Sequence, residues 1–188
     1  GHGKKGSLLA VVAGTKAADV VKVLTKIPLK QRKTVKEVTL DMSNAMDSII
    51  RNSFPHAVLV TDRFHVQQLV SEAVQEVRID LRRQALKEEN EGLKLCRSEK
   101  RRYEPRIFEN GDTKKQLLAR SHLLLFKSES TWSESQTRRK AILFKEFPAL
   151  EHAYHLSMMF RSCYETSHSI EEAKQKLQKW YEKVEQEN

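Results

Sequence analysis

Short apolar runs alternate with helical repeats over the first third of the chain. Runs of this kind, bounded by turn residues, are typical of buried strands. They lie at 8–13, 35–40 and 57–60. Between them, apolar residues recur at helical spacing over 17–27 and 46–54. Because strands and helices alternate, we expect parallel strands joined by right-handed crossovers.

Polar residues and prolines mark the ends of these two predicted helices. Thr15 is placed to cap the first helix and Pro28 to end it. Ser43 or Asn44 is placed to cap the second helix, which ends before Pro55. The end signals therefore agree with the apolar spacing.

A long helix is predicted after Asp62. Its apolar face consists of Val66, Leu69, Val70, Ala73, Val77 and Leu81. Arg78, Arg82 and Arg83 are expected toward the other side of the helix. The pattern fades within the charged stretch 87–106, so we expect a domain boundary near residue 98.

The last third of the chain has helical patterns throughout. From Thr113 onward, one face carries Leu117, Leu118, Ser121, Leu124 and Leu125. Ser133 and Ser169 each begin a capping-box pattern. We therefore expect an α/β protein, with a mixed sheet of parallel βαβ units in residues 1–97 and helices alone in residues 98–188.

The charge of the chain narrows the classes of partner. The 188 residues include 34 Lys and Arg against 25 Asp and Glu, a formal net charge of +9. A polyanion is the leading partner class, although a solvated basic surface has the same composition. No apolar run approaches the ~20 residues of a membrane helix, so no membrane partner is expected. Cys96 and Cys163 are far apart, which favours a reducing, cytoplasmic location.

Two aspartates end neighbouring predicted strands. Asp41 follows the second strand and Asp62 follows the third, with one helix between them. In an open parallel sheet, functional groups collect at the carboxyl ends of the strands, so both carboxylates are expected at one edge. Carboxylate oxygens are ligands that Mg²⁺ prefers. The alternative is that each aspartate only caps the helix that follows it.

The residues around these aspartates resemble a known family. Leu40-Asp41-Met42-Ser43, Phe54-Pro55 and Asp62-Arg63-Phe64-His65 are similar to the middle region of the transposases of ISL-three-type insertion sequences. The downstream matches are Leu117-Leu118-Ala119-Arg120-Ser121, Phe147-Pro148-Ala149-Leu150 and Ala153-Tyr154. The similarity extends from about residue 4 to residue 181.

The resemblance implies a partial RNase H-like core in residues 1–97 and a helical insertion in residues 98–188. It implies a DDE triad of carboxylates that binds Mg²⁺ (or Mn²⁺), with Asp41 as the second, catalytic and metal-binding acid. Asp62 and His65 match an accessory signature near that site. The first acid is expected before Gly1 and the third after Asn188, so the fragment itself is expected to be inactive.

The resemblance also implies DNA, both transposon ends and target, as the partner. Basic residues that are candidates for contacts with DNA are Arg63, Arg101, Arg102, Arg138 and Arg139. Tyr103 or Trp132 is a candidate for stacking on bases. The ordinary alternative for each basic cluster is a solvated helix face. The resemblance implies a nucleoid location and leaves a homo-oligomeric state open.

Other functions fit the sequence less well. A non-catalytic DNA-binding or interaction module on a decayed nuclease scaffold is the main alternative, and a repair nuclease of related fold is another. His152 and His155 lie on one helix face, but no tight ligand pairing completes a zinc site. The spacing of an ATP-binding phosphate loop and the nucleophile elbow of a serine hydrolase are both missing from the sequence.

Overall fold

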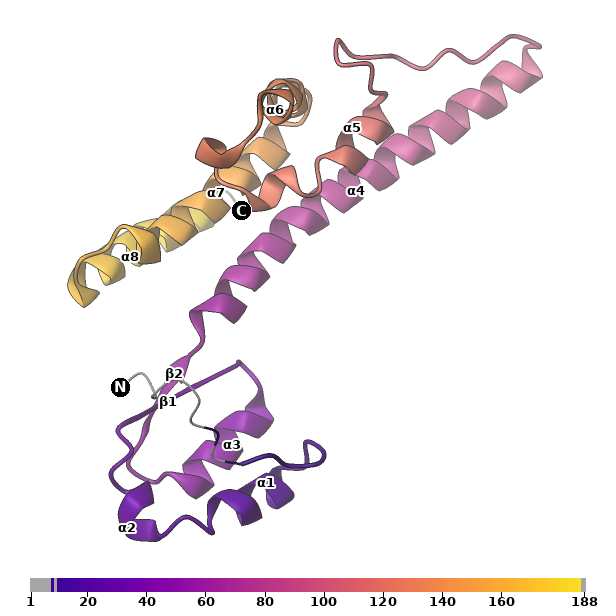
Figure 1. Ribbon diagram of the computed structural model, residues 1–188. Helices are drawn as coiled ribbons and strands as arrows, with labels where there is room; N and C mark the ends of the chain where they lie inside the picture. The colour runs from indigo at the N-terminus through magenta and orange to yellow at the C-terminus, as the bar shows by residue number, and fades with distance from the viewer. Residues whose placement is uncertain (1–7, 9, 187–188) are drawn as a thin grey trace. The chain divides into compact units, whose positions relative to one another are not determined.

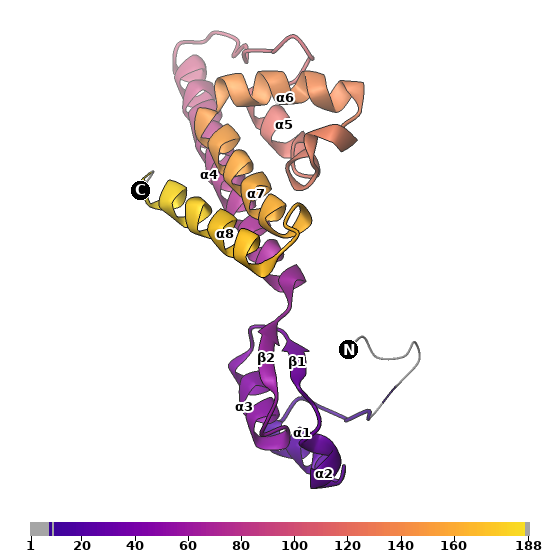
Figure 2. The ribbon, with the colours of Figure 1, turned by 90° about the vertical axis from the view of Figure 1, so that its left-hand side faces the viewer.

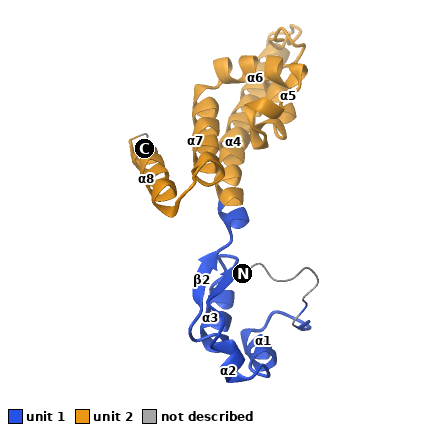
Figure 3. Cartoon of the chain, turned by 60° about the vertical axis from the view of Figure 1, so that its left-hand side comes forward, with its two compact units in different colours: residues 1–66 blue, residues 67–188 orange. Residues whose placement is uncertain are grey.

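The computed structural model describes residue 8 and residues 10–186. Contacts divide the chain into two compact units, Gly1–Val66 and Gln67–Asn188 (Figure 3). The division falls inside the longest helix, near its start at Arg63. Each unit is described by itself.

Unit 1 is a single parallel βαβ arrangement with two further helices. Its elements are α1 (Ala17–Leu24), α2 (Leu29–Arg32), β1 (Glu37–Leu40), α3 (Asn44–Ser53) and β2 (Val58–Thr61). The strands pair in parallel, with Glu37 opposite Val58 and Leu40 opposite Thr61 (Figure 2). The helix α3 connects them, as the alternation of strand and helix predicts.

The core of unit 1 lies between α3, α1 and one face of the sheet. Ile49, Ile50 and Phe54 are buried, and apolar side chains of α1 and of both strands pack against them. Arg32 fastens α2 to the end of α3, because its guanidinium donates to the carbonyl oxygen of Ser53 at 2.6 Å and to that of Ile27 at 2.9 Å.

The predicted strand at 8–13 is wrong for the residues that the structure describes. Residues 8 and 10–13 are irregular, and the side chains of Leu8 and Val11 are exposed; residue 9 lies outside the described residues. A strand requires a hydrogen-bonded partner, and the described residues of this run pair with neither β1 nor β2. The described sheet is therefore two-stranded and parallel rather than mixed.

The predicted ends are wrong for α1 and confirmed for α3. The N-cap of α1 is Lys16 instead of Thr15, and α1 ends at Leu24, so that Pro28 precedes α2 rather than ending α1. The N-cap of α3 is Ser43, and α3 ends just before Phe54-Pro55, as predicted.

The regular elements of unit 2, over its described residues, are helices and one isolated bridge. Its elements are α4 (Arg63–Ser98), α5 (Lys114–Arg120), the 3₁₀ turns η1 (Leu124–Phe126) and η2 (Glu129–Thr131), α6 (Glu134–Glu146), α7 (Pro148–Glu165) and α8 (Ile170–Glu185) (Figure 1). Side chains from α4 to α7 form one core, with Leu117, Leu143, Leu150 and Tyr154 fully buried. The architecture of the whole chain is mixed α/β and mostly helical.

The predicted starts of the helices in unit 2 are confirmed. Ser133 accepts a hydrogen bond from the Gln136 amide at 3.3 Å, and the Gln136 side chain accepts one from the Ser133 amide at 3.0 Å. Ser169 accepts from the Glu172 amide at 3.1 Å. The predicted apolar face after Thr113 is buried throughout.

The predicted orientation of α4 is partly wrong. Leu69 is 52% exposed, and Arg78, which was expected toward the outside, is only 8% exposed. Val77 and Leu81 pack against the core as predicted. The buried face of α4 differs from the predicted one because Gln75 and Arg78 point toward main-chain carbonyls near the end of α5. An apolar pattern cannot indicate such a contact.

Two predictions concern the chain as a whole. The predicted boundary near residue 98, and the assignment of residues 1–97 to a catalytic core and 98–188 to an insertion, stay predictions; α4 ends at Ser98, and the division by contacts lies at Val66. Among the described residues, no helix combines the length and the apolar character needed to cross a bilayer.

Candidate active site

Asp41 and Asp62 lie at the same step beyond the paired strands. Leu40 and Thr61 are the last paired residues of β1 and β2, and each aspartate follows directly. The Asp62 amide donates to the Leu40 carbonyl oxygen at 2.8 Å, which continues the ladder. Neighbouring strands are about 4.8 Å apart, so the two carboxylates start from adjacent backbone positions. The expected placement of both acids at one edge of the sheet is confirmed.

Asp41 is half-buried at the mouth of an open pocket. Its Oδ1 accepts a hydrogen bond from the Ser43 amide at 3.0 Å, which turns the chain into α3. The pocket measures about 220 Å³ and includes side chains from both strands and from the start of α3. Asp47 also lines it, but its carboxylate is engaged by Arg51 at 2.7 Å.

Asp62 caps the first turn of α4. Its Oδ1 accepts from the Phe64 amide at 2.9 Å, and its carbonyl oxygen accepts from the His65 amide at 3.2 Å. The His65 ring is half-buried and lies edge-to-face against the Phe64 ring at 5.6 Å between centroids. One carboxylate oxygen of Asp62 therefore caps α4, as the alternative interpretation of this aspartate expects.

The donor chemistry of this edge suits a hard cation. Asp41 and Asp62 are carboxylates from adjacent strands, and carboxylate oxygen is the ligand type that Mg²⁺ and Mn²⁺ prefer. Over the described part of the chain, however, no three or more His, Cys, Asp or Glu side chains form a group that could hold a metal ion. That finding applies equally to His152 and His155, the zinc alternative.

The five arginines predicted to contact DNA have different surroundings. Arg63 is the exposed first residue of α4. Arg101 forms an ion pair with Glu99, and Arg102 is exposed. On α6, Arg138 lies 3.7 Å from Glu134, whereas Arg139 is 25% exposed and faces a buried carboxylate.

The comparison with known families decides the identity. The model of the ISL-three-type DDE family, described as a transposase, matches residues 2–188. The chain belongs to this transposase family. It has no match among the curated proteins and none among the solved structures. The family implies DNA as the partner, and transposition and recombination of DNA as the process that the chain serves.

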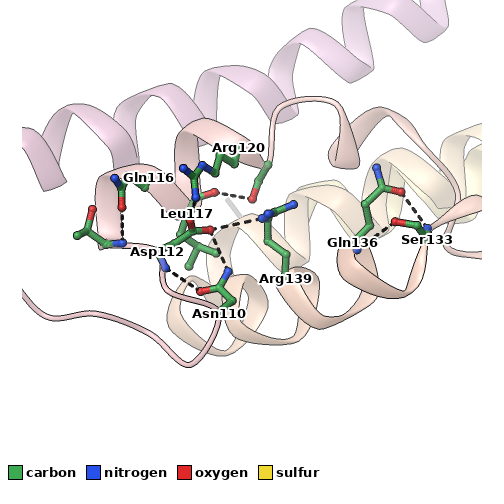
Figure 4. A network of polar contacts seen from close by, with 10 residues as sticks. Asn110, Asp112, Gln116, Leu117, Arg120, Ser133, Gln136 and Arg139 are labelled. Atoms are coloured by element: carbon green, nitrogen blue, oxygen red, sulfur yellow. Dashed lines mark hydrogen bonds and ion pairs between the residues drawn. The ribbon is translucent and has the colours of Figure 1, made fainter.

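In this transposase chain, Asp112 organises the contact between α5 and α6 (Figure 4). Its carboxylate is fully buried and is bound by the Arg120 guanidinium, by Arg139 Nε at 3.5 Å and by Asn110 Nδ2 at 2.9 Å. Asp112 was not among the residues singled out by the sequence pattern. The dipeptide Asn110-Gly111, which is typical of a turn, precedes it in the sequence, and Gly111 adopts a left-handed φ of 79°.

The two aromatic side chains predicted to stack on bases both have packing roles in the transposase. The Trp132 indole donates to the Leu124 carbonyl oxygen at 3.1 Å, and its ring lies against that of Tyr154, 5.5 Å between centroids. Tyr103 is half-buried against the backbone of Gly92 on α4. Both rings are half-buried, and their stacking on bases stays a prediction.

Proposed function

We propose that this chain is the central part of a DDE transposase that cleaves the ends of an insertion sequence and joins them to target DNA. The observation that carries the proposal is the family match over residues 2–188 together with the shared position of Asp41 and Asp62 at the strand ends. Active sites of open parallel sheets lie at the carboxyl ends of the strands, which is where both aspartates stand. We propose further that β1, α3 and β2 belong to an RNase H-like core in the intact enzyme.

Asp41 is the catalytic carboxylate that holds Mg²⁺ or Mn²⁺ in the intact enzyme. The ion, when bound, supplies Lewis-acid activation of the water or hydroxyl that attacks the phosphodiester. The hydrogen bond from the Ser43 amide fixes Asp41 Oδ1, so the carboxylate is oriented before any ligand arrives. Asp62 and His65 are accessory: Asp62 anchors α4, and its neighbour His65 forms the wall beside it.

Arg63, Arg101, Arg102, Arg138 and Arg139 are proposed to contact DNA phosphates. Their surroundings rank them: Arg63, Arg102 and Arg138 are exposed, whereas Arg139 is held by Asp112 and therefore ranks last. We also propose that the enzyme works at the nucleoid, and that the intact enzyme assembles with copies of itself.

The chain alone is proposed to be inactive in cleavage. A two-metal site needs several carboxylates around the ions, and Asp41 and Asp62 have no third metal-binding side chain grouped with them among the described residues. Robust Mg²⁺-dependent nicking by the 188-residue chain, abolished by Asp41→Asn, would overturn this part of the proposal.

The function is tested in the intact enzyme that contains this chain. Strand cleavage of a plasmid that carries the insertion sequence is measured with Mg²⁺ for the wild type, Asp41→Asn and Asp80→Asn. Asp80 is an exposed aspartate of unit 2 that is paired with Arg83, so Asp80→Asn makes the same charge change at a residue outside the proposed site. We expect cleavage to fall at least about 100-fold in Asp41→Asn only. Wild-type cleavage by Asp41→Asn would reject the proposed site.

A further inference from the structure

The chain leaves α4 through a tightly hydrogen-bonded turn. The Arg101 amide donates to the Cys96 carbonyl oxygen at 2.9 Å, and the Lys100 amide donates to that of Arg97 at 3.2 Å. Lys100 has a left-handed φ of 53°. These three features form a Schellman motif, in which glycine usually takes the left-handed position. Here a lysine stands at that position.

A second contact fastens the segment after the turn to α4. The Tyr103 ring lies on the backbone of Gly92, where an added Cβ would be 2.7 Å from the ring carbon Cε2. Cys96 lies beneath the turn and is 3% exposed. Because glycine weakens a helix interior, Gly92 is explained by this close approach of the ring. The turn and the Tyr103 contact together fix the backbone of residues 97–103.

The side chains on this fixed backbone are basic and exposed. Arg97, Lys100 and Arg102 are exposed, and within the described part of the chain they form no ion pair. Arg101 is paired with Glu99 and is 57% exposed. We call residues 97–102 the basic turn. It carries four cations and one anion on six consecutive residues.

We propose that the basic turn is a preformed clamp for the phosphate backbone of duplex DNA, with Gly92 and Tyr103 as its positioning residues. The proposal rests on the proposed function for the identity of the polyanion. Arg97, Lys100 and Arg102 are closely spaced and form no ion pair within the described residues, which suits a row of phosphates because each cation can replace a condensed counterion. A fixed backbone loses less conformational entropy on binding than a mobile basic loop would lose.

The charges are tested with the 188-residue chain and a duplex of mixed sequence, about 30 base pairs long. Fluorescence anisotropy gives the affinity between about 50 and 200 mM NaCl. The variant Arg97→Gln/Lys100→Gln/Arg102→Gln should bind roughly tenfold or more weakly at the lowest salt. The slope of the logarithm of the binding constant against the logarithm of the salt concentration should be smaller in magnitude by about 0.9 for each phosphate that the turn no longer neutralises. The matched control is Lys174→Gln/Lys179→Gln/Lys183→Gln on α8, which removes the same charge from exposed positions and should keep the slope.

The positioning residues are tested without any change of charge. Gly92→Ala displaces the Tyr103 ring, so we expect a weaker affinity and a smaller salt slope although every cation remains. Tyr103→Phe keeps the ring and should bind as the wild type does. Circular dichroism checks that each variant retains its helices.

Each outcome decides the proposal. Unchanged affinity and slope in the triple variant of the basic turn, or an equal loss in the α8 control, would overturn it, as would a wild-type chain that fails to bind duplex DNA at the lowest salt. An acidic protein as the true partner of the turn would give the first of these results. The test is separate from that of Asp41, because binding is measured without cleavage and cleavage is judged by a variant on unit 1.

Discussion

The Arg78 guanidinium on α4 donates a 3.0 Å hydrogen bond to the main-chain carbonyl of Leu118 in the last turn of α5. Its Nε donates to Gln75 Oε1 at 2.7 Å, and the side-chain Nε2 of Gln75 donates to the carbonyl oxygen of His122 at 3.2 Å. Burial lowers the pKa of Arg78, and the nearby charge of Arg82 lowers it further. The carbonyl end of a helix carries partial negative charge, so α5 stabilises this cation through its peptide groups.

Replacing Arg78 should therefore loosen the contact between α4 and α5. Arg78→Met keeps an unbranched side chain but leaves the Leu118 carbonyl without its donor, and we expect a loss of about 2 kcal/mol in the free energy of unfolding. Both tryptophans of the chain, Trp132 and Trp180, lie in unit 2, so tryptophan fluorescence during urea unfolding reports on this unit.

The control for Arg78 is its exposed neighbour on the same helix. Arg82→Met changes the charge equally and should alter the unfolding free energy by no more than about 0.5 kcal/mol. Equal effects of the two substitutions would mean that net charge, and not the hydrogen bond to Leu118, accounts for the loss.

The buried carboxylate of Asp112 leads to a second stability prediction. Asp112→Asn removes the charge that Arg120 and Arg139 share. Breaking a buried pair is costly, but the Arg120 side chain is 56% exposed and regains water, so we expect a loss of about 2 kcal/mol. Urea unfolding followed by tryptophan fluorescence measures it. Asp80→Asn, on the exposed face of α4, should be close to neutral, and a neutral Asp112→Asn would contradict the assigned role of the network.

The Tyr154 hydroxyl provides a pH-dependent signal from the core of unit 2. Burial raises the pKa of Tyr154 to about 12, Glu129 adds to the shift, and its hydroxyl donates to the Lys127 carbonyl oxygen at 2.9 Å. Because the folded pKa lies above the ordinary value of 10.0, the stability that this group contributes is complete below pH 10 and is lost as the pH rises toward 12.

Ultraviolet absorbance at alkaline pH measures this titration. Tyr154 should give a late step in this titration, and Tyr154→Phe should remove it. A late step that persists in Tyr154→Phe would assign it to another tyrosine. The same substitution should cost about 1 kcal/mol, because the Lys127 carbonyl loses its donor.

The sequence predicts the parts of this chain that depend on local signals. The caps at Ser133 and Ser169, and the position of Asp41 at a strand end, follow from residue types a few positions apart. The burial of Arg78 does not, because it depends on a carbonyl 40 residues away. Residues 8 and 10–13 show the same limit: apolar residues favour a strand, but only a pairing partner makes one.

The Gly92–Tyr103 contact should appear as a coupling energy. Alanine favours a helix interior over glycine by about 0.5–1 kcal/mol, so Gly92→Ala should stabilise α4 unless a side chain occupies the space. The Tyr103 ring does occupy it, and we expect Gly92→Ala alone to give no gain. With Tyr103→Ala already present, the same substitution should become stabilising. A double-mutant cycle from urea unfolding measures the coupling, and additive effects would mean that the two residues do not meet in solution.

The two roles assigned to Asp62 are separable by substitution. Asp62→Ala removes the acceptor for the Phe64 amide and should cost about 1 kcal/mol, seen as faster amide exchange in the first turn of α4. Asp62→Asn keeps a side-chain oxygen that caps nearly as well, so the exchange rates should stay near those of the wild type. If Asp62 is also an accessory group of the active site, Asp62→Asn should still lower cleavage by the intact enzyme, because Asp62 follows β2 at the same step at which Asp41 follows β1. Wild-type cleavage by Asp62→Asn would leave Asp62 with the capping role alone.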